Sequence, residues 1–320
     1  MKRYIILILM TLATAGCRYT FELDDADIKP MIAVQADVCA DSATIINIYK
    51  TIPVTEISKA DTILTAPFYT LKCNGKEVDA THTKIGEGGM QIQAPAFKSG
   101  DIVELVYGAE DMETTISKTG IPEKFPEYEI LNKQLSDGAY SLTIKYKEKP
   151  AENRFYGVFA KWRGERVVYD DLDGDGIRAE ELYTENISSF IKPAGNYNSI
   201  NIDPGAYSPT VIYFSQGYVF IWNSEEIKDN SYEFKFRYQY EYEIMGGDEE
   251  KNVELQCTLY TFSEEMYRTL FAYYDYYSNP FAEYGLSSPS FTYSNVKNGL
   301  GRFCGYTKTE TEWFAKAEEK

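Results

Sequence analysis

The sequence between residues 232 and 244 reads YEFKFRYQYEYEI, and it is the strongest local indication of β structure in the chain. Every even-numbered position carries an aromatic or aliphatic side chain, and every odd-numbered position carries a polar or charged one. Strict alternation of this kind predicts a β-strand with one buried face. At about 3.3 Å per residue the strand would be roughly 43 Å long, so we expect it to bend or to pass from one sheet to another.

The residues that follow this strand predict its partner. Gly246 and Gly247 favour a turn, and the alternation then continues as a return strand through Val253, Leu255, Cys257 and Leu259. Further β-like runs precede the pair at residues 140–146, 155–162, 211–214 and 218–222. These runs predict an antiparallel β domain over residues 127–312.

The first half of the chain also shows short β-like runs separated by turn residues, at 31–34, 44–48, 69–73, 90–94 and 102–107. Asn74-Gly75 is typical of a tight hairpin turn. Regular short strands without helical periodicity predict a β-sandwich over residues 30–122. Prolines between Ile121 and Pro126 interrupt the pattern, so we place the domain boundary there.

One helix is expected in this all-β chain. Ser263 can cap a helix whose first turn carries Glu264 and Glu265. Apolar residues then recur at helical spacing through Met266, Leu270, Tyr274 and Tyr277, before Asn279-Pro280. The pattern predicts a helix near 263–277, and residues 313–320 are expected to form a tail.

The amino terminus has the pattern of an export signal. Lys2 and Arg3 precede an apolar run that is too short to cross a bilayer, which needs about 20 residues. Thr14-Ala15-Gly16-Cys17 resembles a bacterial lipobox. The resemblance implies removal of residues 1–16 and attachment of lipid to Cys17, and several acyl chains would make a stable anchor. The alternative is a plain signal peptide with an incidental cysteine.

Residues 17–29 are polar and acidic, and we interpret them as a flexible tether. An acidic cluster after the lipidated cysteine resembles the signal for display on the outer face of the outer membrane in Bacteroidetes lipoproteins. We therefore expect an outer-membrane protein that is exposed at the cell surface, with the periplasmic face as the alternative.

Charge argues against nucleic acid as a partner. The chain has 49 acidic residues against 32 Lys and Arg, for a net charge of −17. Removing the signal would delete two of the positive charges, Lys2 and Arg3. Because nucleic acid is bound through clustered Lys and Arg, we expect none to bind.

Four cysteines remain after Cys17, and their spacing is too wide for a metal knuckle. In an oxidising compartment Cys39 could pair with Cys73, and Cys257 could pair with Cys304. The alternative is four buried thiols, because cysteine also packs as a small apolar side chain.

Residues 171–176 read DLDGDG, which resembles the first half of an EF-hand or dockerin calcium loop. Alternate carboxylates at Asp171, Asp173 and Asp175 suit Ca²⁺, and glycine allows the tight turn. The twelfth position is Leu182, so Glu180 or Glu181 would have to close the site. The alternative is a solvated acidic hairpin tip.

The sequence contains few residues that could form a known catalytic site. His82 is the only histidine, and its polar neighbours predict a surface loop. The sequence therefore offers almost no residues for a Ser-His-Asp triad or a multi-histidine metal site. A hydrolase that uses paired carboxylates is the one enzymatic alternative, and no pair stands out among the acidic residues.

Three stretches together resemble one family. They are residues 100–105 with 119–122, residues 263–267, and a closing stretch made of Asn279-Pro280-Phe281 and residues 294–303, SNVKNGLGRF. The chain resembles the domain-of-unknown-function 4249 family of Bacteroidetes lipoproteins, with Arg302 and Cys304 departing from its more usual aliphatic and small residues. The resemblance implies an amino-terminal immunoglobulin-like β-sandwich and association with TonB-dependent outer-membrane transporters. It implies no site residues.

These observations favour a non-enzymatic lipoprotein of the cell envelope that binds a ligand or partner, as an accessory to TonB-dependent uptake. This hypothesis predicts an aromatic-lined groove in the second domain. A fimbrillin-like structural or adhesive subunit, whose strands exchange between copies, is the alternative.

Overall fold

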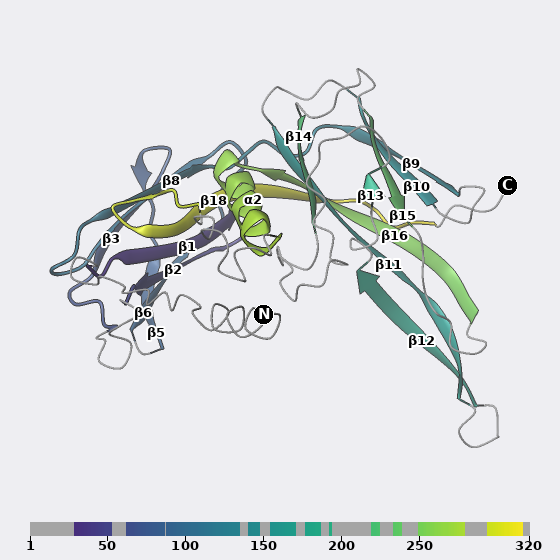
Figure 1. The fold of residues 1–320 in the computed structure, drawn as a ribbon, viewed down its shortest axis with the longest axis horizontal. Coiled ribbons are helices and arrows are strands. Elements are labelled where there is room, and N and C mark those ends of the chain that lie inside the picture. The colour runs from purple at the N-terminus through teal and green to yellow at the C-terminus, as the bar shows by residue number, and fades with distance from the viewer. Residues whose placement is uncertain are drawn as a thin grey trace, which may run out of the picture.

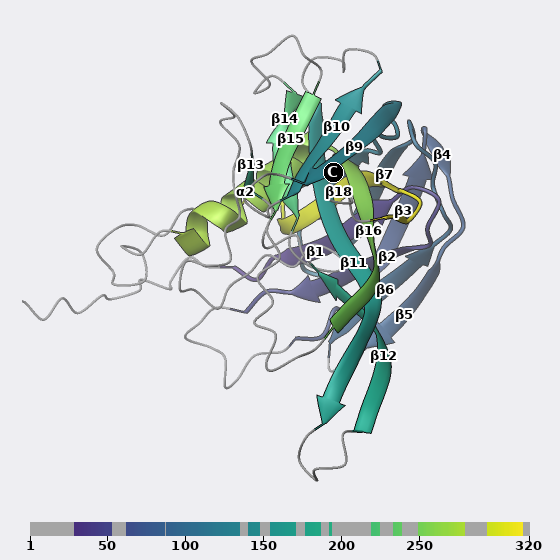
Figure 2. The same ribbon diagram turned by 90° about the vertical axis from the view of Figure 1, so that its right-hand side faces the viewer.

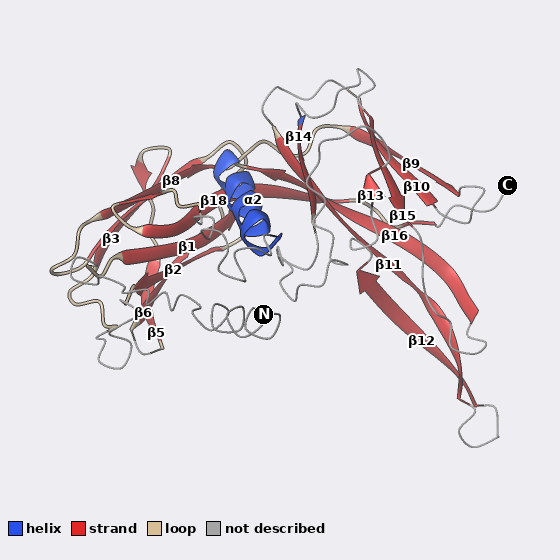
Figure 3. Ribbon diagram, in the orientation of Figure 1, coloured by secondary structure: helices blue, strands red, loops and turns tan. Residues whose placement is uncertain are grey.

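The computed structural model of the 320-residue chain describes residues 29–52, 62–86, 88–134, 140–147, 154–170, 177–186, 192–193, 219–224, 233–238, 249–278 and 293–315. Its elements there are strands and one helix, which confirms the all-β fold class. Every pairing between the named strands is antiparallel except that of β1 with β18. Figure 3 shows the helix crossing the middle of a body otherwise built from strands.

Two sheets enclose the core of the first half of the chain. In one sheet, neighbouring strands are β1 (Ile32–Cys39), β2 (Thr44–Lys50), β6 (Gly89–Ala94) and β5 (Thr81–Ile85). In the other, they are β17 (Val296–Lys297), β8 (Thr115–Gly120), β7 (Ile102–Gly108), β3 (Phe68–Cys73) and β4 (Lys76–Glu77). The five expected strands of this half and the turn at Asn74-Gly75 are confirmed.

Alternation along these strands builds the core. Val34, Ala36 and Val38 of β1 point inward and join Leu105 and Tyr107 of β7 in one buried cluster. The intervening residues of β1, such as Gln35 and Asp37, lie on the opposite face. The first half is therefore a two-sheet body with one apolar interior.

The carboxy-terminal part of the chain completes this body. Strand β18 (Leu300–Glu310) pairs in parallel with β1, with Ala33 opposite Leu300 and Cys39 opposite Tyr306. Strand β17 pairs with β8 of the other sheet. The sequence boundary assigned both strands to the second domain, but β17 and residues 300–306 of β18 pair with strands of the first half.

Gly301 shows how tightly β18 fits against β1. Its φ is +106°, and a Cβ built there would lie 2.1 Å from the carbonyl oxygen of Val34. An L side chain would therefore be both strained and overlapping at this position. The closing stretch of the sequence thus contains a glycine that the β1 contact requires.

The second half of the chain extends the same large sheet. Beyond β18 lie β16 (Glu249–Phe262), β11 (Phe155–Asp170) and β12 (Ile177–Asn186), with β14 (Phe220–Asn223) on β11 and β19 (Phe314–Ala315) on β16. A separate sheet contains β13 (Lys192–Pro193), β15 (Glu233–Tyr238), β10 (Tyr140–Tyr146) and β9 (Tyr128–Gln134). Figure 1 shows β18 running through the middle of the molecule, between the two groups of strands.

Within the described residues, the expected return strand does not pair with the alternating stretch that precedes it. Of residues 232–244 the structure describes Glu233–Tyr238, which is β15 and pairs with β10 and β13. Residues 253–259 belong to β16, which pairs with β11, β18 and β19 in the other sheet. Regular alternation predicted each strand, but it contains no information about which strand is the neighbour.

The central strands are covered on both faces. Tyr156 of β11 contacts Tyr146 of β10 with ring centroids 5.8 Å apart, so this face packs on the smaller sheet. The ring of Phe125 fills the same interior, with its centroid 5.6 Å from that of Tyr146 and 5.0 Å from that of Tyr156. The segment 121–126 is therefore packed, with Ile121 and Phe125 buried, and is not an exposed linker.

Helix α2 (Glu264–Ser278) covers the opposite face, which confirms the predicted helix. Met266 and Leu270 pack with Phe262 and Cys304, and Phe155 stacks on Tyr267 at 4.6 Å. The Ser263 hydroxyl accepts a hydrogen bond from the Met266 amide at 3.2 Å, as expected for a cap. Among the described residues, no helix combines the length and apolar character needed to cross a membrane.

The hairpin of β11 and β12 projects from the body. Its ladder runs from Lys161 opposite Asn186 to Asp170 opposite Ile177. Figures 1 and 2 show this hairpin reaching beyond the other described strands in both views. The DLDGDG residues, 171–176, follow β11 and precede β12 in the sequence, and they lie outside the described residues.

Candidate functional site

A cavity of about 720 Å³ lies at one end of the first body, and we name it the sandwich-end cavity. Chain segments meet there from five places: the start of β1, the end of β2, the segment before β3, the β7–β8 turn and the β17–β18 turn. The lining residues are Lys29, Pro30, Met31, Ile32, Lys50, Ile63, Thr65, Glu110, Asp111, Met112, Glu113 and Asn298.

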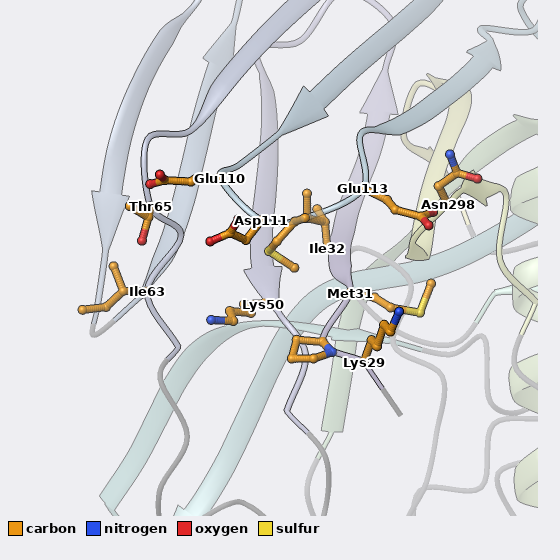
Figure 4. Close-up of a pocket in the computed structure, with 12 residues that line it drawn as sticks. Lys29, Met31, Ile32, Lys50, Ile63, Thr65, Glu110, Asp111, Glu113 and Asn298 are labelled. Atoms are coloured by element: carbon orange, nitrogen blue, oxygen red, sulfur yellow. The ribbon is translucent and has the colours of Figure 1, made fainter. Parts of the chain in front are cut away.

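The walls combine an apolar floor with charges of both signs. Figure 4 shows Glu110 and Asp111 on one side, Glu113 with Asn298 on the other, and Ile32 between them. Ile32 is buried and Met31 and Met112 are half-buried, whereas the three carboxylates and Lys29 are exposed. This arrangement suits an amphipathic ligand that carries a charged group.

Backbone hydrogen bonds hold the walls in place. The Glu110 amide donates to the Thr65 carbonyl at 2.9 Å, and the Met112 amide donates to the Ala109 carbonyl at 3.2 Å. Asp111 lies in this turn with a φ of 59°, a left-handed conformation that aspartate tolerates better than most residues. On the opposite wall, Met31 and Thr51 exchange bonds of 2.8 Å.

A second cavity of about 280 Å³ lies beside α2, and we name it the helix-side cavity. Its residues come from α2, from β1, β2 and β18, and from the segment before β17. They are Ala33, Val34, Gln35, Tyr49, Thr269, Ala272, Tyr293, Ser294, Leu300, Gly301 and Arg302. Arg302 is held by Asp37 through two hydrogen bonds, Nε to Oδ1 at 2.9 Å and Nη2 to Oδ2 at 2.8 Å.

The predicted calcium ligands are not brought together in the described part of the chain. Asp171, Asp173 and Asp175 lie outside the described residues. Glu180 and Glu181 lie in β12, opposite Val167 and Arg166. An EF-hand loop is followed by a helix, whereas here the strand β12 follows. Each residue of a strand lies about 3.3 Å further from the loop than the one before it. Calcium at this tip stays a prediction.

The four cysteines are all free, so neither proposed disulfide is formed. The side chain of Val38 points into the core, and Cys39 lies on the other face of β1. Cys73, by contrast, packs against the core that contains Val38. The Cys257 carbonyl accepts a hydrogen bond from the Thr311 amide. Cys304 precedes Thr311 by seven residues, so it lies roughly 20 Å along β18 from Cys257. Disulfides need Cα atoms within about 7 Å, so the strand positions exclude the Cys257–Cys304 pair.

His82 does not lie in a surface loop, contrary to the prediction. It is part of β5 and is half-buried between two tyrosine rings, with centroids 5.0 Å from Tyr69 and 5.9 Å from Tyr107. Burial lowers the pKa of His82. Polar neighbours suggested a loop because Thr81 and Thr83 occupy the exposed face of the same strand.

Two further expectations concern residues beyond the described part. Cys17, the predicted lipidation site, lies outside the described residues. For the alternating stretch, the backbone of Glu233–Tyr238 is described but its side chains are not, so the predicted aromatic groove stays a prediction.

Sequence reasoning did not find either cavity. The residues that line the sandwich-end cavity are distant in sequence, from Lys29 to Asn298, and no motif contains them. One signal was available, since Glu110, Asp111 and Glu113 form a polar turn after the predicted strand at 102–107. Only the pairing of β18 with β1 shows that Asn298 lies at the same end.

Comparison with known proteins adds a family and little else. No curated protein matches the sequence. The adhesin InvE of Yersinia pseudotuberculosis aligns with 13% identity over 73% of this chain and 55% of that one, so the chain spans about half its length. The TM-score of 0.21 does not establish a shared fold. The sequence of residues 18–312 matches the family described as domain of unknown function DUF4249. The chain therefore belongs to the DUF4249 family.

Proposed function

We propose that this protein is an exported, lipid-anchored binding protein of the outer membrane, displayed at the cell surface and without enzymatic activity. In this proposal the sandwich-end cavity binds a ligand or partner, as an accessory to a TonB-dependent transporter. Support comes from the lipobox-like residues 14–17, from the family resemblance and from the position of the cavity.

The observation that carries the proposal is the position of Lys29. This residue ends the predicted tether and also lines the sandwich-end cavity. If Cys17 is anchored, residues 18–29 can extend to at most about 40 Å. The cavity would then stay close to the membrane, where a transporter could reach its ligand.

The chemistry of the lining supports binding over catalysis. Its charged groups are the carboxylates of Glu110, Asp111 and Glu113 and the amines of Lys29 and Lys50. The three carboxylates are exposed, and exposed carboxylates lack the environment that tunes a general acid near neutral pH. An apolar floor beneath mixed charges suits reversible binding.

Photocrosslinking in living cells would test this proposal. A photoreactive amino acid replaces Glu110 in the cavity, and a matched variant carries it at Glu77, an exposed residue in β4. The β3–β4 turn lies at the opposite end of the strands from the cavity, so Glu77 samples the far end of the same body. We expect a crosslink to a TonB-dependent transporter, identified by mass spectrometry, from position 110 and not from position 77. Equal crosslinking from both positions, or none from position 110, contradicts the proposal.

An adhesive or structural subunit is the second candidate, and β12 is the observation that favours it. Among the described residues, β12 pairs with β11 alone along Ile177–Asn186, and a strand at the edge of a sheet is the element to which a strand of another copy could add. Sedimentation of the purified protein separates the two functions. The binding protein is expected to sediment as a monomer, whereas strand exchange produces oligomers.

A further inference from the structure

The helix-side cavity differs in charge from the rest of this acidic protein. Among the described residues of its lining, Arg302 is the one that carries a charge, and the Asp37 carboxylate neutralises it through the two-bond contact. Both side chains are less than one third exposed, which strengthens the pairing. Burial raises the pKa of Tyr293, so its phenol is neutral at pH 7. A cavity without net charge gives no advantage to an ionic ligand.

Small side chains create the space. Ala272 on α2 faces β1 and β18 across the cavity, and Ala33 and Gly301 line it from the strands. At about 280 Å³ the cavity has room for a single small ring or a chain end. The rim is open, with Tyr49 42% exposed and Leu300 45% exposed.

The lining combines polar groups with aromatic rings. Gln35 offers both a donor and an acceptor, and Ser294 contributes a hydroxyl group. The Thr269 hydroxyl donates to the Glu265 carbonyl at 2.8 Å and Arg302 is held by Asp37, so these two side chains form a fixed polar wall. Tyr49 and Tyr293 supply ring surfaces. A ligand that matches both features needs many hydroxyl groups and an apolar face, and it needs no charge.

A row of amides continues from the cavity across the same face of the sheet. Gln35 lies opposite Asn47, and Asn47 lies opposite Gln91. The Gln91 amide donates to Asn47 at 3.0 Å, and the Gln93 amide donates to Gln91 at 3.1 Å. Side-chain amides donate and accept at once, as sugar hydroxyls do. Further units of a chain-like ligand could therefore lie over β2 and β6.

We propose that the helix-side cavity and its amide row bind a neutral carbohydrate, with one sugar ring seated between Tyr49, Gln35 and Arg302. This site is separate from the sandwich-end cavity and does not depend on its function. Substitutions at the two sites share no residue, so the failure of one proposal leaves the other standing.

Saturation-transfer NMR on the full purified protein tests the inference. The probes are the methyl glycosides of glucose, galactose, mannose and xylose, with galacturonate and glucosamine as charged comparisons. Tyr49→Ala removes the exposed ring, and Ala33→Leu fills the cavity. The control is Ile45→Ala, on the same strand and 50% exposed but outside the lining. Thermal melting checks that each variant is folded.

We expect saturation transfer to at least one neutral glycoside, with affinity about tenfold weaker or more in Tyr49→Ala and Ala33→Leu and unchanged in Ile45→Ala. A hexasaccharide of the bound sugar should bind more tightly than the single glycoside, and Gln91→Ala should remove that gain. The inference is overturned if no neutral sugar shows transfer, if the three variants behave alike, or if a charged sugar binds best.

Discussion

Asp37 and Arg302 lie 265 residues apart in the sequence, and their side chains are joined by hydrogen bonds of 2.9 and 2.8 Å. The pair bridges β1 and β18, the two strands that pair in parallel. It links the beginning of the described chain to its closing segment. The first body is therefore complete only when β18 is in place.

This pair should stabilise the fold measurably. Because both groups are partly buried and the geometry is bidentate, we expect Asp37→Asn or Arg302→Met to lower the free energy of unfolding by about 1–2 kcal/mol. The double variant should lose less than the sum of the two single losses. Urea unfolding measures all three, and strict additivity would contradict a direct interaction. As a control, the exposed Lys308–Glu310 pair at 3.8 Å should contribute less than about 0.5 kcal/mol.

Gly301 should be among the least replaceable residues in β18. Gly301→Ala forces a side chain into a left-handed conformation and against the Val34 carbonyl, so we expect a loss of roughly 2–4 kcal/mol. Gly75→Ala is the matched control, because Gly75 has a φ of +78° and no atom within 4 Å of the added Cβ. It should lose only about 1 kcal/mol. Equal losses would show that contact with β1 is unimportant.

The strand positions explain what the sequence predicted and what it did not. The runs around Ile46 and Leu105, and the capped helix after Ser263, were predictable because burial pattern and capping are local properties. The pairing of β1 with β18 was not, because a parallel pair distant in sequence leaves no local pattern. Both cavities depend on that pairing, because Asn298 lines one and Arg302 lines the other. They could therefore not be predicted from the sequence either.

His82 should make the fold sensitive to mild acid. Since burial lowers its pKa in the folded state below 6.5, the unfolded chain binds the proton more tightly. The stability associated with neutral His82 is complete above pH 6.5 and is lost as pH falls through the folded-state pKa. His82→Phe keeps a ring between Tyr69 and Tyr107 but cannot titrate. In urea unfolding, the free energy of unfolding of the wild type should fall relative to that of the variant as the pH is lowered from 7 to 5. If the two free energies change in parallel with pH, His82 does not have this role.

The number of reactive thiols shows whether the cysteines form disulfides. We expect four reactive thiols in the denatured protein, from Cys39, Cys73, Cys257 and Cys304, because the sulfur of Cys17 would be blocked by lipid. In the native protein Cys257 and Cys304 should react slowly, since burial raises the pKa of each to about 12. Titration with a thiol reagent, with and without denaturant, measures both. A count of two or none would mean that disulfides form despite the strand positions.

Mass spectrometry of the protein purified from membranes tests most directly whether Cys17 anchors these sheets to a membrane. We expect the chain to begin at Cys17 and to carry acyl groups there, and we expect Cys17→Ser to leave the signal in place and residue 17 without lipid. A chain that begins elsewhere, or an unmodified Cys17 on a protein recovered in the soluble fraction, would contradict it.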